Sequence, residues 1–249
     1  MKLVRFLHQG SSRCGILDGN EITGLDNGFF GTVKQGRKLL LSEVKLLSPC
    51  TPSKIVAVGL NYRDHAEELG FPIPEEPVIF LKPPTTVIGP GDEIRYPAAS
   101  SRVDFEAELG IVIRKQARNI TPAQAQNHIL GFTCANDVTA RDLQKKDGQW
   151  TRAKSFDTFC PIGPWIETDL DPADLLIESY LNNERKQSSR TSRFIFTMSQ
   201  MVSFIAGIMT LEPGDVIITG TPAGIGSMQR GDEIEVRIEG IGSLRNKVR

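Results

Sequence analysis

Residues 103–113 of the 249-residue chain read VDFEAELGIVI. Apolar and acidic side chains alternate along this stretch, and a period of two predicts a β-strand. Because successive side chains of a strand point to opposite faces, Asp104, Glu106 and Glu108 should share one face. An exposed polar face is the simplest explanation. Three features oppose it: no Lys or Arg lies between the acids, the stretch ends in a Gly-Ile-Val-Ile run typical of a buried sheet, and a further acid, Asp137, follows another buried-looking segment.

A buried group of carboxylates carries an electrostatic cost that limits what it can be. Two ionised carboxylates about 4 Å apart repel each other by about 4 kcal/mol at an effective dielectric constant of about 20. A partly buried cluster therefore needs shared protons or a bound cation. Carboxylate oxygens with no His or Cys beside them suit a hard ion such as Mg²⁺, Mn²⁺ or Ca²⁺, and not zinc. Three protein ligands would leave three positions of an octahedral ion for water and substrate, which is typical of a catalytic site.

A second candidate centre lies upstream, where residues 61–70 read NYRDHAEELG. An Asn that can cap a helix and a Gly that can end one predict a short helix between them. His65 and Glu68 are three residues apart, so they would be neighbours on one helical face. A carboxylate beside an imidazole fixes its tautomer and makes it a better base. Spacing alone favours a plain surface pair, but His8 and His128 lack such a setting, which makes His65 the best candidate base.

Three weaker signals follow in the chain. Arg141 and Gln144 would lie on one side of a short helix just after Asp137. Lys154 is surrounded in sequence by small and aromatic residues, as a buried ammonium group would be. Residues 220–226, GTPAGIG, follow an apolar strand and lack the Gly-Lys-Ser/Thr ending of a phosphate loop. They fit either a loop whose backbone receives a carboxylate or a plain structural turn.

The composition excludes several classes of protein. Lys and Arg number 29 against 30 Asp and Glu, which gives a formal net charge of −1. This balance argues against nucleic-acid binding, which normally leaves a basic excess. The four cysteines form no C-x-x-C pair, so the sequence predicts reduced thiols in a cytoplasmic protein and no zinc ribbon. Residues 194–211 carry no charge, but their polar side chains favour an amphipathic helix in the core over a membrane span.

The rest of the chain reads as a β-rich α+β protein with a small N-terminal region. Residues 1–50 contain short apolar runs and the hairpin-type turn signals Asp18-Gly19 and Asn27-Gly28. In the region 51–249, strand-like segments outnumber helical ones. Residues 121–124, TPAQ, give the clearest helix start, with a capping box and Pro at the first helical position. The chain has no G-x-G-x-x-G or Walker-type loop.

Six motifs occur in order along roughly residues 54–248. They are GLNYRDH at 59–65, FLKP at 80–83, DFEAEL at 104–109, NDVTARD at 136–142, KSFD at 154–157 and GTPAG at 220–224. Together they resemble the fumarylacetoacetate hydrolase family, and six motifs in one order are far more specific than any one of them. The resemblance implies a mixed β-roll of the fumarylacetoacetase C-terminal type over 51–249, with residues 1–50 as a small β-rich appendage. It also implies a homodimer.

The same resemblance implies a set of site residues. The metal, Mg²⁺ or Mn²⁺, would be held by Glu106, Glu108 and Asp137. An acid/base dyad of His65 and Glu68 would sit on a lid over the substrate. The other residues of the implied site are Lys154, in catalysis, and Arg141, Gln144, Gly220 and Thr221, in substrate binding.

Members of this family act on 2-oxo acids, often 2,4-dioxo acids, so the implied partner is a small molecule and neither a nucleic acid nor a membrane. We expect an acylpyruvate hydrolase with oxaloacetate decarboxylase activity, because the compact segment after Glu68 favours small substrates. A 2-hydroxyhepta-2,4-diene-1,7-dioate isomerase and an oxaloacetate tautomerase are the alternatives within the family. A hypothesis of another class is a non-catalytic scaffold whose acidic strand holds structural Ca²⁺ or no ion.

Overall fold

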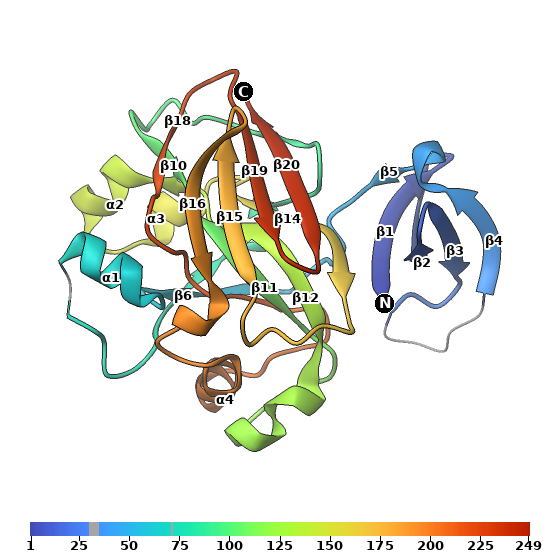
Figure 1. Ribbon diagram of the computed structural model, residues 1–249, viewed down its shortest axis with the longest axis horizontal. Coiled ribbons are helices and arrows are strands. Elements are labelled where there is room, and N and C mark those ends of the chain that lie inside the picture. The colour runs from blue at the N-terminus through green and yellow to red at the C-terminus, as the bar shows by residue number, and fades with distance from the viewer. Residues whose placement is uncertain (30–34, 71) are drawn as a thin grey trace.

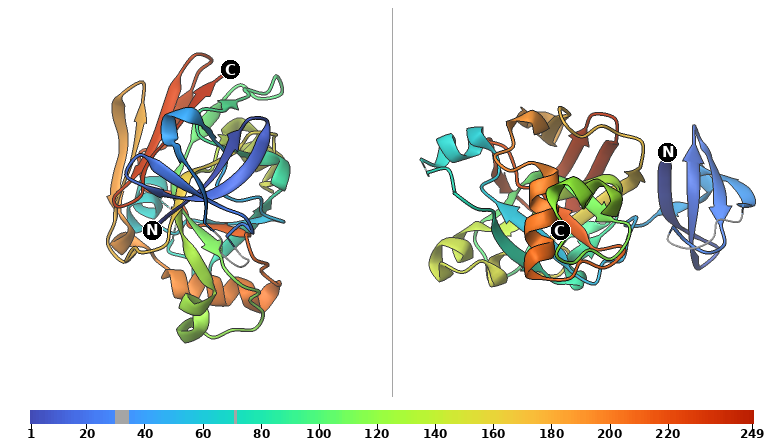
Figure 2. Two further views of the ribbon diagram at one scale, coloured as in Figure 1. Left: turned by 90° about the vertical axis from the view of Figure 1, so that its right-hand side faces the viewer. Right: turned by 90° about the horizontal axis from the view of Figure 1, so that it is seen from below.

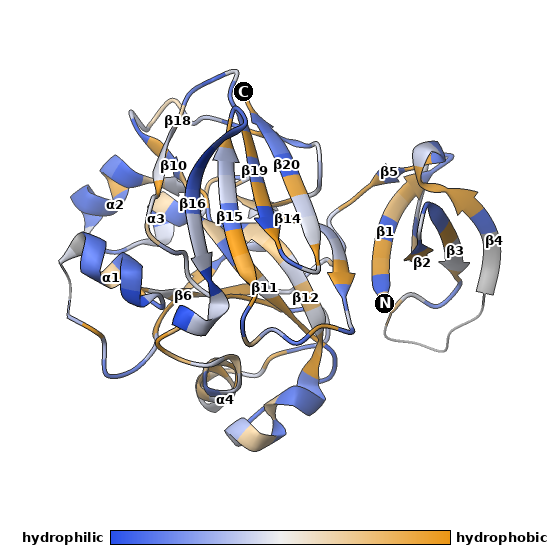
Figure 3. Cartoon of the chain, viewed as in Figure 1, coloured by the Kyte–Doolittle hydropathy of each residue, from blue (hydrophilic) through white to orange (hydrophobic). Residues whose placement is uncertain are grey.

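The computed structural model describes residues 1–29, 35–70 and 72–249, and it confirms a β-rich α+β fold (Figure 1). The described strands form a twelve-stranded mixed sheet, a five-stranded sheet and a three-stranded sheet. The helices of the described residues are short. Figure 3 shows apolar residues concentrated on β6 (Ile55–Gly59), β11 (Ala107–Ile113) and β12 (Ile129–Asn136) in the middle of the body. The elements α1 (Arg63–Leu69), α2 (Arg141–Asp147) and β16 (Glu184–Arg190) are mostly polar.

The first part of the chain extends one end of the large sheet. Its elements are β1 (Lys2–His8), β2 (Ser11–Asp18), β3 (Glu21–Leu25), β4 (Gln35–Leu40), the 3₁₀-helix η1 (Leu41–Glu43) and β5 (Lys45–Leu46). β1 pairs with β14 (Cys160–Glu167) of the body. The hairpin predicted at Asp18-Gly19 joins β2 to β3. The Asn27-Gly28 signal leads into residues 30–34, which lie outside the described residues.

Three groups of elements make up the body. The strands of the large sheet are β6 (Ile55–Gly59), β7 (Val78–Lys82), β8 (Val87–Ile88), β11 (Ala107–Ile113), β12 (Ile129–Asn136), β14 and β17 (Val216–Ile218). The smaller sheets contain β9 (Glu93–Ile94), β15 (Leu176–Leu181), β16 (Glu184–Arg190), β19 (Glu233–Ile238) and β20 (Gly242–Val248), and β10 (Val103–Phe105), β13 (Thr139–Ala140) and β18 (Gly226–Met228). The helices are α1 (Arg63–Leu69), α2 (Arg141–Asp147), α3 (Thr151–Lys154) and α4 (Met198–Ile208), with 3₁₀-helices η2 (Pro84–Thr86), η3 (Pro122–His128) and η4 (Thr191–Arg193).

The main core lies between the large sheet and the five-stranded sheet, with α4 packed against it (Figure 2). Ile111 of β11, Ile177 of β15 and Val236 of β19 meet there. The uncharged segment 194–211 contains α4, whose Met201 and Ile205 are fully buried in this core. The predicted amphipathic core helix is therefore confirmed. Among the described residues, no helix combines the length and apolarity that a membrane crossing requires.

The predicted strand over 103–113 is interrupted at Glu106, which separates β10 from β11. Asn136 Oδ1 accepts a hydrogen bond from Glu106 N at 3.0 Å, and Gln187 Oε1 accepts one from Ala107 N at 3.0 Å. Because side-chain amides replace ladder partners there, β10 leaves the large sheet and pairs with β13 and β18. Every residue of the stretch is buried. The exposed polar face that a plain alternating strand would have is therefore absent.

Two predicted helix starts differ in detail from the structure. Asn61 does not cap α1, since Tyr62 is the N-cap residue and makes no side-chain cap. The Asn61 side chain instead donates to Thr219 O at 2.8 Å and accepts from Phe196 N at 2.8 Å, which joins β6 to two other segments. Gly70 ends α1 in the left-handed conformation, as predicted. The capping box at 121–124 is present, but the helix that it starts is a 3₁₀-helix, η3.

Four strands of the large sheet bring one set of ends together. β6 and β17 run parallel, with Ile55 opposite Val216. β11 is antiparallel to both of its neighbours, β12 and β17. The carboxyl ends of β6, β12 and β17 therefore lie beside the beginning of β11. The residues that follow these ends are thus placed next to the glutamates at the start of β11.

Asp215 fixes the start of β17 against the start of β6. Its buried carboxylate accepts hydrogen bonds from Ser53 N at 3.0 Å, from Lys54 N at 3.2 Å and from Glu212 N at 2.8 Å, and it forms an ion pair with Lys54. Burial alone would raise the pKa of Asp215. The donors of Lys54, Glu212 and Ser53 outweigh burial and hold this pKa below its ordinary value.

We expect Asp215→Ala to lower the free energy of unfolding by about 3 kcal/mol, because three backbone N–H groups lose a charged acceptor. Since the folded-state pKa is lowered, the contribution is fully present above the unfolded-state pKa of about 3.9 and is lost as the pH falls through the folded-state value. Urea unfolding over a pH series measures both effects. Ser53→Ala keeps the backbone donors paired and should cost about 1 kcal/mol. An equal loss in the two variants would contradict this account.

Candidate active site

Three carboxylates meet at the shared ends of the sheet. Glu106 lies between β10 and β11, Glu108 is in β11, and Asp137 directly follows β12. They are 5%, 2% and 1% exposed, and one carboxylate oxygen of each lies within 4.8 Å of the others. The structure therefore brings together the three residues that the sequence resemblance nominated as metal ligands. We call these three residues the acidic triad.

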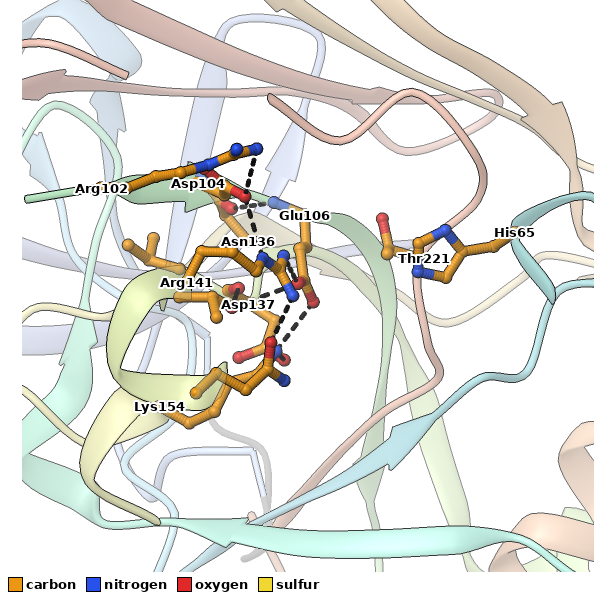
Figure 4. A network of polar contacts seen from close by, with 12 residues as sticks. His65, Arg102, Asp104, Glu106, Asn136, Asp137, Arg141, Lys154 and Thr221 are labelled. Atoms are coloured by element: carbon orange, nitrogen blue, oxygen red, sulfur yellow. Dashed lines mark hydrogen bonds and ion pairs between the residues drawn. The ribbon is translucent and has the colours of Figure 1, made fainter. Parts of the chain in front are cut away.

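Three basic side chains contact members of the acidic triad, and Figure 4 shows two of them, Arg141 and Lys154, beside Glu106 and Asp137. Lys154 Nζ donates to Glu106 Oε2 at 2.8 Å and also binds Asp137. Lys82 pairs with Asp137, and Arg141 pairs with Glu106. Burial alone would raise the pKa of Glu106, but the charges and hydrogen bonds of Lys154 and Arg141 outweigh it and lower this pKa. Two members of the triad are thus charge-compensated by the protein itself.

Glu108 differs from the other two members of the triad. It forms no ion pair with any described residue, and its Oε2 accepts a hydrogen bond from Gly220 N at 2.7 Å. Burial, followed by the charges of Asp137 and Glu106, raises the pKa of Glu108 well above its ordinary value. Glu108 therefore has no cationic partner among the described residues, and its neighbours Glu106 and Asp137 present carboxylate oxygens that can act as metal ligands. This donor set fits a hard divalent ion such as Mg²⁺ or Mn²⁺.

Asp104 belongs to a different cluster, although the alternating pattern grouped it with the two glutamates. Its fully buried carboxylate accepts from Arg102 Nε at 2.8 Å and from Arg141 Nε at 2.9 Å. Two arginines therefore satisfy its charge without a metal. Arg141 Nη1 also donates to Gln144 Oε1 at 2.6 Å, so both residues lie on one side of α2, as predicted.

His65 and Glu68 form the predicted pair on α1. His65 Nδ1 lies 3.0 Å from Glu68 Oε2, and the histidine is only 6% exposed. Glu68 Oε1 accepts a hydrogen bond from Gly224 N at 3.1 Å. The pair is therefore held against the glycine-containing loop and is not a free surface pair. Since Glu68 occupies Nδ1, Nε2 is the ring nitrogen that is left for a substrate or a water molecule.

One cavity of about 510 Å³ connects the acidic triad with the His65–Glu68 pair. It is lined by the acidic triad and by every other predicted site residue, namely His65, Glu68, Arg141, Gln144, Lys154, Gly220 and Thr221. Figure 4 shows His65 and Thr221 on one side, and Glu106 and Asp137 with Arg141 and Lys154 on the other. The loop 220–226 does receive carboxylates through its backbone, but they are those of Glu108 and Glu68.

Sequence reasoning assigned no role to two residues that support this site. Lys82 is 1% exposed and forms an ion pair with Asp137. In the sequence, a lysine at the end of the apolar strand 78–82 was the signal that could have indicated this role. Gln187 is also buried, and its Nε2 donates to Thr221 Oγ1 at 2.8 Å while its Oε1 accepts from Ala107 N. No pattern around Gln187 distinguishes it, because its partners are far away in sequence.

Comparisons with known proteins agree with this arrangement. Residues 54–249 match the family described as fumarylacetoacetate (FAA) hydrolase C-terminal, and residues 1–49 match the one described as Rv2993c-like, N-terminal. Oxaloacetate tautomerase FAHD2B, mitochondrial, of Bos taurus is 39% identical over 259 residues, which cover 99% of this chain and 79% of the relative.

Solved structures are similar over the whole chain. The 2-hydroxyhepta-2,4-diene-1,7-dioate isomerase from Mycobacterium marinum is 46% identical with a TM-score of 0.93, and the match covers 100% of this chain and 98% of that one. The maleylpyruvate hydrolase from Sphingobium sp. SYK-6, in complex with manganese (II) ion and pyruvate, is 29% identical with a TM-score of 0.83 and the same coverage. The homodimer and the cytoplasmic location stay predictions.

Uptake of Mg²⁺ or Mn²⁺ by the chelator-treated protein should become tighter as the pH rises. The raised pKa of Glu108 favours its protonated form in the metal-free protein, and a metal binds the ionised carboxylate, so binding should release a proton. The affinity should rise about tenfold for each pH unit while one proton is released, and calorimetry with Mn²⁺ in buffers of different ionisation enthalpy counts the protons.

Two variants sharpen this measurement. Glu108→Gln should weaken binding and abolish most of the pH dependence, because an amide has no proton to release. Asp104→Asn makes the same chemical change on the same stretch outside the acidic triad, and it should keep the pH dependence. Binding that is independent of pH in the unmodified protein would contradict the role given to Glu108.

Proposed function

The chain belongs to the fumarylacetoacetate hydrolase family, and from this membership we propose that it is a divalent-metal-dependent enzyme acting on small 2-oxo acids. The reaction that we put first is hydrolysis of an acylpyruvate, with decarboxylation of oxaloacetate as a second activity. One observation carries the proposal. A buried acidic triad with one member lacking a cation shares a cavity with a histidine–glutamate pair.

The residues that would hold Mg²⁺ or Mn²⁺ are Glu106, Glu108 and Asp137. When bound, such an ion supplies Lewis acidity that polarises the 2-oxo group of a substrate. Lys154 and Arg141 border the same cavity, and both are cations in a water-poor setting. Fixed positive charges there stabilise the negative charge that develops on the substrate as a bond beside the oxo group breaks.

His65 supplies the base in this scheme. Glu68 holds the Nδ1 side of the ring, so Nε2 can take a proton from a water molecule that attacks the distal carbonyl of an acylpyruvate. The bond between C3 and C4 then breaks, and its electron pair stays on C3. A proton returned to C3 completes pyruvate, and the acyl fragment leaves as a carboxylic acid. Thr221, which Gln187 holds from outside the cavity, lies on the same side as His65 (Figure 4).

Proton transfer at C3 of oxaloacetate is the second candidate. It needs the same base and the same cations but no attacking water. The name of the Bos taurus relative, an oxaloacetate tautomerase, supports this candidate. The isomerase of Mycobacterium marinum supports a related rearrangement of an unsaturated diacid. Hydrolysis, tautomerisation and isomerisation all require that negative charge be stabilised beside the 2-oxo group of the substrate.

Turnover of acetylpyruvate, oxaloacetate and 2-hydroxyhepta-2,4-diene-1,7-dioate with Mg²⁺ decides among them. We expect acetylpyruvate to give the highest kcat/KM and oxaloacetate to be decarboxylated more slowly. Turnover of the dienoate alone, or tautomerisation of oxaloacetate with no hydrolysis, would overturn our first choice.

Glu106→Gln should abolish turnover while the circular dichroism spectrum stays unchanged. A wild-type protein with no activity to lose would instead favour the non-catalytic scaffold.

His65→Ala should lower kcat for acetylpyruvate by about a hundredfold to ten-thousandfold, which is the range of general-base catalysis. Mn²⁺ affinity should stay the same, because His65 is not a member of the acidic triad. His128→Ala removes a histidine that does not line the cavity, and it should change neither quantity. Normal hydrolysis by His65→Ala would rule out this histidine as the base.

A further inference from the structure

Four apolar side chains that line the cavity have no role in the proposed chemistry. Phe80 of β7 and Trp150, between α2 and α3, contact each other edge to face with ring centroids 5.2 Å apart. Leu60 and Ile225 line the same cavity. We call these four residues the apolar wall. They come from four separate segments of the chain, so the fold, and not one local run of sequence, assembles them.

The apolar wall begins directly beside the acidic triad. Lys154 Nζ lies 5.0 Å from the centroid of the Phe80 ring and donates to Glu106 Oε2 at 2.8 Å. One ammonium group therefore separates the aromatic surface from the carboxylates. A 2-oxo acid whose carboxyl end lies at the triad would carry its distal carbons along this wall.

The backbone under Trp150 is adapted to the indole. A Cβ atom on Gly59 would lie 2.7 Å from Trp150 Cζ3 and 2.9 Å from Cη2, so glycine lets the ring lie on strand β6. The next residue, Leu60, has a φ of 52°, in the left-handed region that non-glycine residues rarely adopt. Strain of this kind collects at ligand-binding positions. Here the strained residue directly follows β6 and is itself a member of the apolar wall.

Most of the cations that line the cavity already pair with carboxylates of the protein, so few are left to bind a second carboxylate of the substrate. Arg102 and Arg141 both pair with Asp104, and Arg141 and Lys154 pair with Glu106. Lys145 is the one lining cation without a carboxylate partner among the described residues, and it is exposed. The cavity volume of about 510 Å³ lies within the range of about 300–1,000 Å³ that is usual for small-molecule sites.

We propose that the apolar wall is a subsite for an uncharged carbon substituent at the distal end of the substrate, with Trp150 as the residue that determines this specificity. The inference rests on the proposed function, because it assumes that the 2-oxo acid end lies at the acidic triad. The substrate class is then a 2,4-dioxo acid with an alkyl or aryl acyl group. Burial of the substituent against the indole provides the selectivity.

Three oxamates with one common head test the subsite by binding and not by turnover. N-methyloxamate, N-propyloxamate and N-(carboxymethyl)oxamate are titrated into the Mg²⁺-saturated protein by calorimetry. We expect N-propyloxamate to bind more tightly than N-methyloxamate, by up to about fourfold for each added methylene. Tighter binding of the carboxymethyl compound would overturn the proposal. Equal binding of all three would overturn it as well and leave the proposed function standing, whereas no binding of any of them would overturn both.

Variants assign the effect to the wall. Trp150→Ala should lose the preference for the propyl group and bind N-methyloxamate within about twofold of the unmodified protein, and Trp150→Phe should recover most of the preference. Gly59→Ala displaces the indole without removing it, so it should weaken the preference even if Trp150→Ala does not fold. An unchanged preference in Trp150→Ala or in Gly59→Ala would exclude Trp150.

The chain has two tryptophans, which allows a direct optical test. Trp165 lies outside the cavity, 4.6 Å from Lys2 Nζ, so Trp165→Phe leaves Trp150 as the only indole reporter. N-propyloxamate should move the emission of Trp150 to shorter wavelength, because the ligand displaces water from the ring. Binding of this compound without any change in emission would contradict contact with Trp150.

Discussion

Charge compensation among buried carboxylates is the constraint on which the site depends. Glu106 and Asp137 have basic partners within the protein, but among the described residues Glu108 has only the backbone N–H of Gly220 as a hydrogen-bond donor. A buried acid without a cation stays protonated or recruits a positive ion. The arrangement around the triad follows from this difference in charge compensation between Glu108 and the other two carboxylates. Lys82 and Lys154 compensate two charges, and the third defines the place where a divalent ion fits.

Parts of the site were predictable because they form short local groups in the sequence, and the resemblance to the family joined these groups into one site. The alternating acids at 104–108 and the i, i+3 spacing of His65 and Glu68 each describe one local element. The fold class followed in the same way, since strand-like segments outnumber helical ones. What local pattern could not provide was the partner of each acid. Asp104 looks equivalent to Glu106 in the sequence, yet two arginines bind it and remove it from the triad.

Other features could not be predicted because they depend on contacts across the fold. The break at Glu106 exists because the side-chain oxygens of Asn136 and Gln187 accept hydrogen bonds from backbone N–H groups that a neighbouring strand would otherwise bind. Gln187 is eighty residues from Ala107 in the chain. Asn61 looked like a helix cap because Asn often is one, but its amide binds the end of β17. In each case a tertiary hydrogen bond overrode a local preference.

The loop after β17 is a part of the site in which few substitutions can be tolerated. Gly220 N and Gly224 N donate hydrogen bonds to Glu108 and Glu68, so the acidic triad and the histidine–glutamate pair share one backbone segment. Gly224 has a φ of 96°, and a methyl group on it would lie 2.3 Å from Lys186 O. Substitutions here would disturb the proposed metal ligand and the partner of the proposed base together. Divergence toward new substrates is therefore channelled to the side chains around the far end of the cavity, which can vary without disturbing the reacting groups.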